Sequence, residues 1–181
     1  ASNSDDSYIY SFEDESELKD DWGLNQSVDM ESEWNFNPGE ATHWKWKNGV
    51  AVDGTSSIMI DREELMIGSA EIISKAYDLS ALSNPAIKFS WAGAAANTFP
   101  ENELIVTYSD DCGRFWRSLG TINALLAANA GLYTYNFTPD STQWNDTVMT
   151  KNQLSGDNIR FKFEYAIIGN TNNFYLDNIQ I

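Results

Sequence analysis

The segment 158–168, NIRFKFEYAII, is the feature that most limits how this chain can fold. Its apolar side chains are Ile159, Phe161, Phe163 and Tyr165, and they alternate with Arg160, Lys162 and Glu164. Successive side chains of a β-strand point to opposite faces, so this alternation predicts a strand with one buried face. A sheet that packs on a core with one face and meets water with the other is typically antiparallel.

Other short segments continue the β pattern. The candidate strands are 8–13, 56–61, 71–80, 86–94, 103–109, 115–120, 132–137, 143–149 and the closing 172–181, with turn sequences such as VDGT and TPDST between them. The 7 Trp, 8 Tyr and 9 Phe favour pleated, half-buried surfaces. Helix is expected only in two short stretches, 16–22 and 122–130. Many short strands separated by turns indicate an all-β sandwich or barrel, and we expect two antiparallel sheets.

The domain organisation follows from length. A chain of 181 residues is long enough for one domain with a proper core. We interpret residues 1–7, ASNSDDS, as a linker or a trimmed start, and residues 8–181 as a single β-sandwich domain. A candidate strand lies at each end of that domain, so we expect the first and last strands to lie close together in one sheet.

The formal net charge of −16 excludes some classes of partner. Nucleic-acid binding needs clustered Lys and Arg, and anionic membrane surfaces also attract basic segments. Twelve acids and one base, Lys19, precede Ala41. This acidity fits either a solvated surface or a site at which one or two of the acids hold a cation.

The single cysteine, Cys112, rules out a disulfide within the chain. No apolar run reaches the length that a membrane-spanning helix needs, so no membrane insertion is expected. No secretory h-region opens the sequence, which is what either a mature export product or an excised module would show.

The sequence contains few of the residues and motifs that common catalytic sites use. His43 is the only histidine, and the sequence contains no HExxH, GxSxG or Cys/His cluster. These absences argue against the common zinc hydrolases and a Ser-His triad. The acids of FEDESE (12–17) raise the possibility of a glycosidase, but their spacing does not resemble a pair of carboxylates facing across a cleft. We therefore expect no catalytic residues and no enzyme activity.

The stretch SDDCGRFW (109–116) resembles the Asp-box of sialidases and other β-proteins. The matching positions are Ser109, Asp111, Gly113 and Trp116, while Phe115 stands where that motif usually has a hydroxyl. In those proteins the Asp caps a hairpin turn, the Gly takes a strained backbone position and the Trp packs beneath. The resemblance implies a structural hairpin with Gly113 at positive φ and Trp116 largely buried.

A second aromatic feature is HWKWKNG (43–49). If the segment is extended, Trp44 and Trp46 share one face and Lys45 and Lys47 share the other. Exposed aromatic faces stack on sugar rings, but in a β-protein such a pair also serves as core. Trp44 and Trp46 are therefore candidate ligand-binding residues, with core packing as the alternative.

The last strand contains a carboxylate in an unexpected place. In NNFYLDNIQI, simple alternation puts Asp177 on the face of Tyr175, Ile179 and Ile181, which looks like core. A buried carboxylate must be paired, protonated or bound to a metal. Asp177 either accepts backbone N–H groups, pairs with an Arg or Lys, or binds a cation.

Four segments in order resemble one family. They are YSFEDESELKDDW, VDGTSSIMI, VTYSDDCGRFW and NFYLDNIQI, and together they span nearly the whole chain. The pattern is similar to the MAM-like domains of secreted bacterial proteins, the cleaved-adhesin or choice-of-anchor J group. FEDESE departs from that pattern because it lacks a glycine that usually follows Phe-Glu-(Asp/Asn).

The resemblance implies a jelly-roll β-sandwich with a structural calcium near the junction of the first and last strands. By matching position, Glu13 and Asp177 would be side-chain ligands, and the turn VDGTSS would add oxygens from Asp53 or from nearby backbone carbonyls. Calcium binds several oxygen ligands of these kinds.

The resemblance also implies a function. We expect a non-catalytic accessory or adhesion module of an exported, larger bacterial protein, secreted or at the cell surface. Its partner would be a glycan or a protein, or it would act as a spacer beside other domains of the same polypeptide. The alternative is a stand-alone glycan hydrolase or lyase on the same fold.

Overall fold

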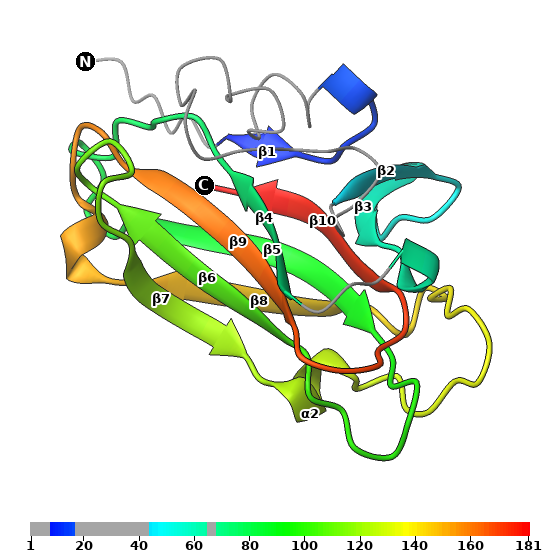
Figure 1. Cartoon of the computed structure of the whole chain (residues 1–181). Coiled ribbons are helices and arrows are strands. Elements are labelled where there is room, and N and C mark those ends of the chain that lie inside the picture. Colours follow the sequence, from blue (N-terminus) through cyan, green and yellow to red (C-terminus); the bar gives the residue numbers. More distant parts are fainter. Residues whose placement is uncertain (1–7, 17–43, 65–67) are drawn as a thin grey trace.

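The computed structural model describes residues 8–16, 44–64 and 68–181, and two antiparallel β-sheets dominate it (Figure 1). The larger sheet has six strands in the order β2-β3-β10-β5-β8, with β1 paired to β10. The smaller sheet has four strands in the order β4-β9-β6-β7. The prediction of an all-β sandwich with two antiparallel sheets is confirmed.

The larger sheet contains β1 (Ile9–Tyr10), β2 (Lys45–Asn48), β3 (Ser56–Ile60), β5 (Ala86–Gly93), β8 (Asn145–Thr150) and β10 (Phe174–Gln180). The smaller sheet contains β4 (Gly68–Ile73), β6 (Glu103–Ser109), β7 (Arg117–Ile122) and β9 (Arg160–Ile167). Among the connections that the structure describes are the 3₁₀ turns η2 (Arg62–Glu64) and η3 (Asn152–Leu154) and the short helix α2 (Ala124–Ala127).

Most expected strands form close to their expected bounds. In β9, buried and half-buried residues alternate along the whole strand, as the sequence pattern predicts. Three segments depart from these bounds: 8–13 forms only the two-residue β1, 71–80 overlaps β4 only at residues 71–73, and 132–137 contributes only an isolated bridge between Leu132 and Ala95. The helix expected over 122–130 shrinks to one turn capped by Asn123. The helix expected over 16–22 lies outside the described residues, apart from Ser16.

The main core lies between the sheets. Phe89 packs edge-to-face on Phe163 across it, and Phe174 stacks on Trp91 and Tyr165. A second, smaller cluster contains Val50, Met59, Ala92, Ala94, Phe137 and Tyr175. Phe174 and Leu176 of β10 belong to the main core, so Tyr175, which lies between them, faces the other side of the six-stranded sheet.

The last strand changes face halfway along, which corrects the expectation that Asp177 lies with Ile179 and Ile181. The register of β10 against β5 shifts between Asp177 and Gln180, and Asn178 has φ 50° in the left-handed region. This irregularity turns Ile179 and Ile181 into the main core, whereas Asp177 stays on the face of Tyr175. Strict alternation fails here because a bulge adds a residue to the strand.

Two different strands pair with the same side of β10. β3 pairs with Phe174–Leu176, and β1 pairs with Ile179 and Gln180. Outside the named strands, Tyr8 and Ile181 exchange backbone hydrogen bonds of 3.0 and 2.9 Å. Asp177 and Asn178 therefore lie in the interval between the two partner strands, where the ladder is interrupted.

Candidate cation site and surface aromatics

Asp177 fills this interval with its side chain. It is 0% exposed, and its Oδ2 accepts a 2.9 Å hydrogen bond from the N–H of Val52 and a long 3.5 Å contact from that of Asp53. Its Oδ1 accepts a 2.7 Å bond from the N–H of Asn178. Among the described residues, no Lys or Arg pairs with Asp177. The carboxylate therefore meets backbone N–H groups, one of the outcomes considered from the sequence.

Burial makes the charged form of Asp177 costly. The pKa of Asp177 is raised to about 7, chiefly by burial and to a smaller extent by the nearby Glu13 charge, while the three N–H donors act in the opposite direction. Backbone donors therefore compensate the buried charge only in part. A bound cation would supply what the N–H groups do not.

Glu13 reaches the same turn from the other side. Its Oε1 accepts the N–H groups of Thr55 at 2.8 Å and Ser56 at 3.1 Å, and its Oε2 accepts the Thr55 hydroxyl at 2.8 Å. The backbone N–H of Thr55 is the main reason that the pKa of Glu13 is lowered. Phe12 has φ 53°, so the chain turns sharply after β1 and sends Phe12 into the core and Glu13 to the surface turn.

Gly54 lets Glu13 approach this closely. Gly54 has φ 73°, and a Cβ built on it would lie 2.2 Å from Oε1 of Glu13. Only a residue without a side chain fits between the carboxylate and the backbone here. The sequence predicts that the turn VDGTSS contributes oxygens, from Asp53 or from backbone carbonyls, whereas the contacts that the structure shows come from its N–H groups. The role of Gly54 has no counterpart in that prediction.

The structure brings Glu13 and Asp177 to one turn without gathering a cluster of acids. In the described ranges, no three His, Cys, Asp or Glu side chains are grouped closely enough to hold a metal ion. Asp53 offers its N–H to Asp177, and its side chain is exposed. Ser57, the last residue of VDGTSS and already part of β3, is 0% exposed and its hydroxyl has no hydrogen-bond partner in the described part of the chain.

Trp44 cannot stack on a ligand, which corrects its assignment as a binding residue. It is 0% exposed and packs edge-on against Tyr165 and Phe174, and its indole N–H donates to the carbonyl of Ala70. Trp46 is half-buried against the main core, and its indole N–H donates to the carbonyl of Phe12 at 2.8 Å. The core alternative therefore describes Trp44, and Trp46 ties β2 to the end of β1.

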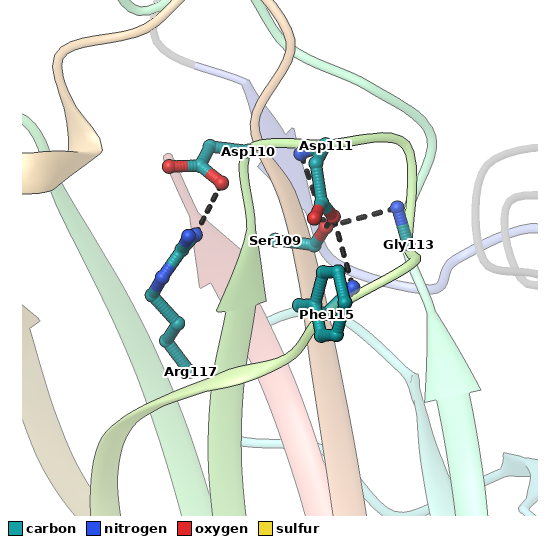
Figure 2. A network of polar contacts seen from close by, with 6 residues as sticks. All are labelled: Ser109, Asp110, Asp111, Gly113, Phe115 and Arg117. Carbon is teal, nitrogen blue, oxygen red and sulfur yellow. Dashed lines mark hydrogen bonds and ion pairs between the residues drawn. The ribbon is translucent and has the colours of Figure 1, made fainter.

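The hairpin between β6 and β7 forms the turn that its sequence implies (Figure 2). The Ser109 hydroxyl donates to Asp111 and accepts the N–H of Gly113 at 2.9 Å, and Asp111 accepts the N–H of Phe115 at 3.0 Å. Gly113 has φ 86°. Asp110 pairs with Arg117 beside the turn.

Trp116 is only half-buried, contrary to the expectation that it would be largely buried. Its ring lies on the solvent face of the four-stranded sheet, with the ammonium of Lys162 5.3 Å from the ring centroid. Lys162 also pairs with Glu71 at 2.9 Å and Glu164 at 3.5 Å. The alternation of 158–168 had placed Lys162 on this face, but the contact with Trp116 has no signal in the sequence.

His43 lies outside the described residues. No helix in the part of the chain that the structure describes is both long and apolar enough to cross a membrane.

The fold is that of cleaved adhesin domains. The chain is similar to the K2 cleaved adhesin domain of Lys-gingipain, with 15% identity and a TM-score of 0.64 over 96% of this chain and 98% of that one. It is also similar to the K1 domain from Porphyromonas gingivalis W83, with 14% identity and a TM-score of 0.54 over 80% and 85% of the two chains.

A carbohydrate-binding module shares the same architecture. CBM27-1 of Caldicellulosiruptor saccharolyticus, solved with mannohexaose, has 12% identity and a TM-score of 0.62 over 97% of this chain and 96% of that one. No protein-family model matches the sequence, and no curated protein matches it significantly. The resemblance to cleaved-adhesin jelly-roll domains is thus confirmed at the level of the fold.

Proposed function

We propose that this chain is a non-catalytic binding module of an exported, larger protein, with a structural calcium where its first and last strands meet. The observation that supports the calcium most strongly is the buried Asp177 carboxylate, which shares a turn with Glu13 and pairs with no described cationic side chain. A buried charge of this kind requires compensation. The two carboxylates lie beside one turn and repel each other, so a cation bound between them would be stabilised by both charges.

The residues at this turn offer the types of ligand that calcium binds. Carboxylate oxygens from Glu13 and Asp177 would be the charged ligands, with Asp53 or backbone carbonyls of the 52–56 turn adding neutral or further acidic oxygens. Calcium accepts six to eight such oxygens in flexible geometry. When bound, the ion would compensate both carboxylates and hold β1, β10 and the turn together, which is a structural role.

The binding role rests on the fold and on the sheet surface. Cleaved adhesin domains and a mannohexaose-binding module share the architecture of this chain. A glycan would find one half-exposed indole, Trp116, beside polar side chains on the solvent face of the four-stranded sheet. Stacking on an indole face combined with hydrogen bonds from fixed polar groups is a common way to bind sugar rings.

The exported, cell-surface location is part of the same proposal. The strong negative charge suits a soluble extracellular module, and the described ends of the chain lie side by side at Tyr8 and Ile181. A domain whose ends are adjacent can be placed between others, or act as a spacer, without disturbing its core.

A glycan array and a hydrolysis assay on the purified chain test the binding role. We expect no turnover of peptide or glycan substrates, and we expect any glycan binding to weaken when Trp116 is replaced by Ala but not when exposed Phe115 is. Hydrolysis that persists through repeated purification would contradict the non-catalytic role and show that the chain is an enzyme. An array without hits would remove the glycan and leave a protein partner or a spacer.

A further inference from the structure

One end of the sandwich exposes a cluster of large apolar side chains, which we call the loop-end surface. Its members are Phe99, Leu125, Leu126, Leu132 and Ile168, and their exposed fractions run from 51% for Leu126 to 78% for Phe99. They come from the β5–β6 loop, from α2 and the segment after it, and from the β9–β10 loop. These elements lie at the lower end of Figure 1, away from the C-terminus.

Strand pairing places the three loops at the same end. The end of β5 pairs with the start of β10 at Gly93 and Phe174, and the end of β9 pairs with the start of β6 at Ala166 and Glu103. Residues 8 and 181, by contrast, meet beyond the other end of β10. The loop-end surface therefore points away from the place where the described chain ends meet.

Hydrogen bonds hold the loops against one another. The N–H of Ala95 donates to Gly131 at 2.8 Å, and the N–H of Tyr133 donates to Ala95 at 2.9 Å. Asn102, which is 3% exposed, accepts the N–H groups of Ile168 and Gly169 at 2.6 and 3.1 Å. The apolar side chains thus stand on a backbone that is fixed before any partner arrives, which lowers the entropy cost of binding.

The single turn of α2 shows that this exposure is not a by-product of packing. Ala127 is the buried residue of the helix, while Leu125 and Leu126 point outward. A helix that only packed on the core would bury its larger side chains. Clustered exposed apolar side chains are typical of a site for a partner.

Charge identifies the kind of partner. The segments 94–102, 123–144 and 168–173 contain no Lys and no Arg, while Glu101 and Asp140 are acidic, and Glu103 follows at the start of β6. An anionic membrane or a second copy of a chain with net charge −16 would be repelled. A glycan would meet aliphatic tips where it needs hydrogen-bonding groups.

We propose that the loop-end surface docks a protein partner whose contact surface combines apolar side chains with Lys or Arg. This rests on the proposed role as a binding module and names the class of partner. Apolar anchors would supply most of the affinity and the acidic surroundings would select for a basic partner and speed its association.

The test uses two synthetic peptides of equal length and equal positive charge. One is an amphipathic Leu/Lys peptide, and in the other every Leu is replaced by Ser. Binding to the whole chain is measured by isothermal titration calorimetry. Because every 1.4 kcal/mol is a factor of ten, we expect the Leu/Lys peptide to bind at least about tenfold more tightly than the Ser/Lys peptide. We expect its affinity to fall from about 50 to about 300 mM salt.

A matched pair of variants locates the binding. Phe99→Ser with Leu125→Ser should weaken binding of the Leu/Lys peptide by about tenfold or more. Phe115→Ser with Val148→Ser removes two exposed apolar side chains elsewhere, 70% and 62% exposed against 78% and 76% for Phe99 and Leu125, and should leave the affinity unchanged. All four positions are at the surface, and equal melting temperatures will show that the variants fold.

The proposal would be overturned if both double variants lost affinity for the Leu/Lys peptide equally, or if the parent chain bound the two peptides with equal affinity. A dimer in sedimentation that Phe99→Ser abolishes would overturn it too and assign the surface to a second copy. Glycan binding and the response to calcium involve the other end and the sheet face, so neither should change in the Phe99/Leu125 variant. Failure of the peptide test would therefore leave the proposed function standing.

Discussion

Glu13, just after the first strand, and Asp177, in the last strand, accept hydrogen bonds from the same five-residue turn, 52–56. Along β10, the turn thus occupies the interval between the partner strands β3 and β1, where none of the described strands pairs with β10 on that side. Asp177 is held by the first half of the turn and Glu13 by the second half, with Gly54 between them. The two carboxylates are near enough for the Glu13 charge to raise the pKa of Asp177.

Removal of calcium should lower the melting temperature, and calcium should restore it. A ligand that binds only the folded chain adds about 2.7 kcal/mol of stability at a hundred times its dissociation constant. Magnesium should restore less, because it demands tighter octahedral geometry. Differential scanning fluorimetry with chelator and with each metal provides the measurement.

Variants assign the calcium response to its residues. Asp177→Asn should abolish most of the response, while Asp157→Asn, which removes one exposed carboxylate elsewhere, should keep it. Identical melting curves with chelator and with calcium, from protein that contains no metal by elemental analysis, would contradict the proposed site.

The pH dependence of stability without metal should carry the signature of Asp177. Its folded pKa is about 7 and its ordinary value is 3.8, so between these values the folded chain keeps a proton that the unfolded chain has lost. Its contribution to the free energy of unfolding is therefore largest below about pH 4 and falls as the pH rises to about 7. Glu13 acts in the opposite sense, since its lowered pKa favours the folded state at higher pH.

Urea titrations of the parent and of Asp177→Asn at a series of pH values isolate this contribution. The parent should lose stability relative to the variant between about pH 4 and pH 7. If calcium binds the ionised Asp177 carboxylate, saturating calcium should abolish this loss of stability of the parent between about pH 4 and pH 7. A constant difference across this range, without metal, would show that Asp177 keeps an ordinary pKa.

Gly54→Ala should destabilise the chain through Glu13. The added Cβ would lie 2.2 Å from Oε1, and the backbone has φ 73°, so the carboxylate must leave the turn. In a Glu13→Ala background the same substitution should cost less, because only the backbone strain remains. A double-mutant cycle measured by chemical denaturation gives this coupling. Additive effects would mean that Glu13 does not depend on the glycine.

Gly113→Val should destabilise the β6–β7 hairpin. Gly113 has φ 86°, and its nearest neighbour to a new Cβ is Trp116 at 3.6 Å, which is ordinary contact. The cost is therefore one of backbone conformation, about 1–2 kcal/mol. Gly113→Asn should cost less, because Asn tolerates the left-handed region. Thermal melts of the three proteins compare them, and a Val variant as stable as the parent would contradict this view of the turn.

The two tryptophans Trp44 and Trp116 should separate stability from binding. Trp44→Ala empties a fully buried site and should cost about 3–5 kcal/mol. Trp116→Ala removes a half-exposed ring and should cost clearly less, while weakening any glycan binding. Unfolding curves and an affinity measurement distinguish the two. A Trp44 variant with unchanged stability would place that ring outside the core.

The sequence predicts the fold well because its strands are half-buried. The alternation of 158–168 reports which side chains of β9 face the core, and the structure keeps that assignment along the strand. Local turn chemistry was equally readable, since the Ser-x-Asp-x-Gly spacing sets the hairpin at 109–113. Both signals lie within a few neighbouring residues.

The site was harder to predict because it depends on irregular backbone. Asn178 and Phe12 both adopt positive φ, which reverses the face of the residues that follow. Asn tolerates this region, but many Asn residues do not adopt it, and Phe12 gives no signal of it at all. Trp44 was ambiguous for another reason. A pair of tryptophans at alternate positions looks the same in a core as on a binding surface, and only packing against Tyr165 and Phe174 decides.

The side-by-side placement of Tyr8 and Ile181 sets how this domain would respond to mechanical force. A pull that separates those two residues loads the short β1–β10 pairing from its open end, so the pairs Ile9–Gln180 and Tyr10–Ile179 would break one after another, as in unzipping. The peeling would then reach Phe12 and Glu13, where the Trp46 indole and the 52–56 turn hold the chain from the side. Resistance to stretching would thus arise at the contacts of Phe12 and Glu13 rather than in the sheets. An ion bound there would add to the force needed to break those contacts.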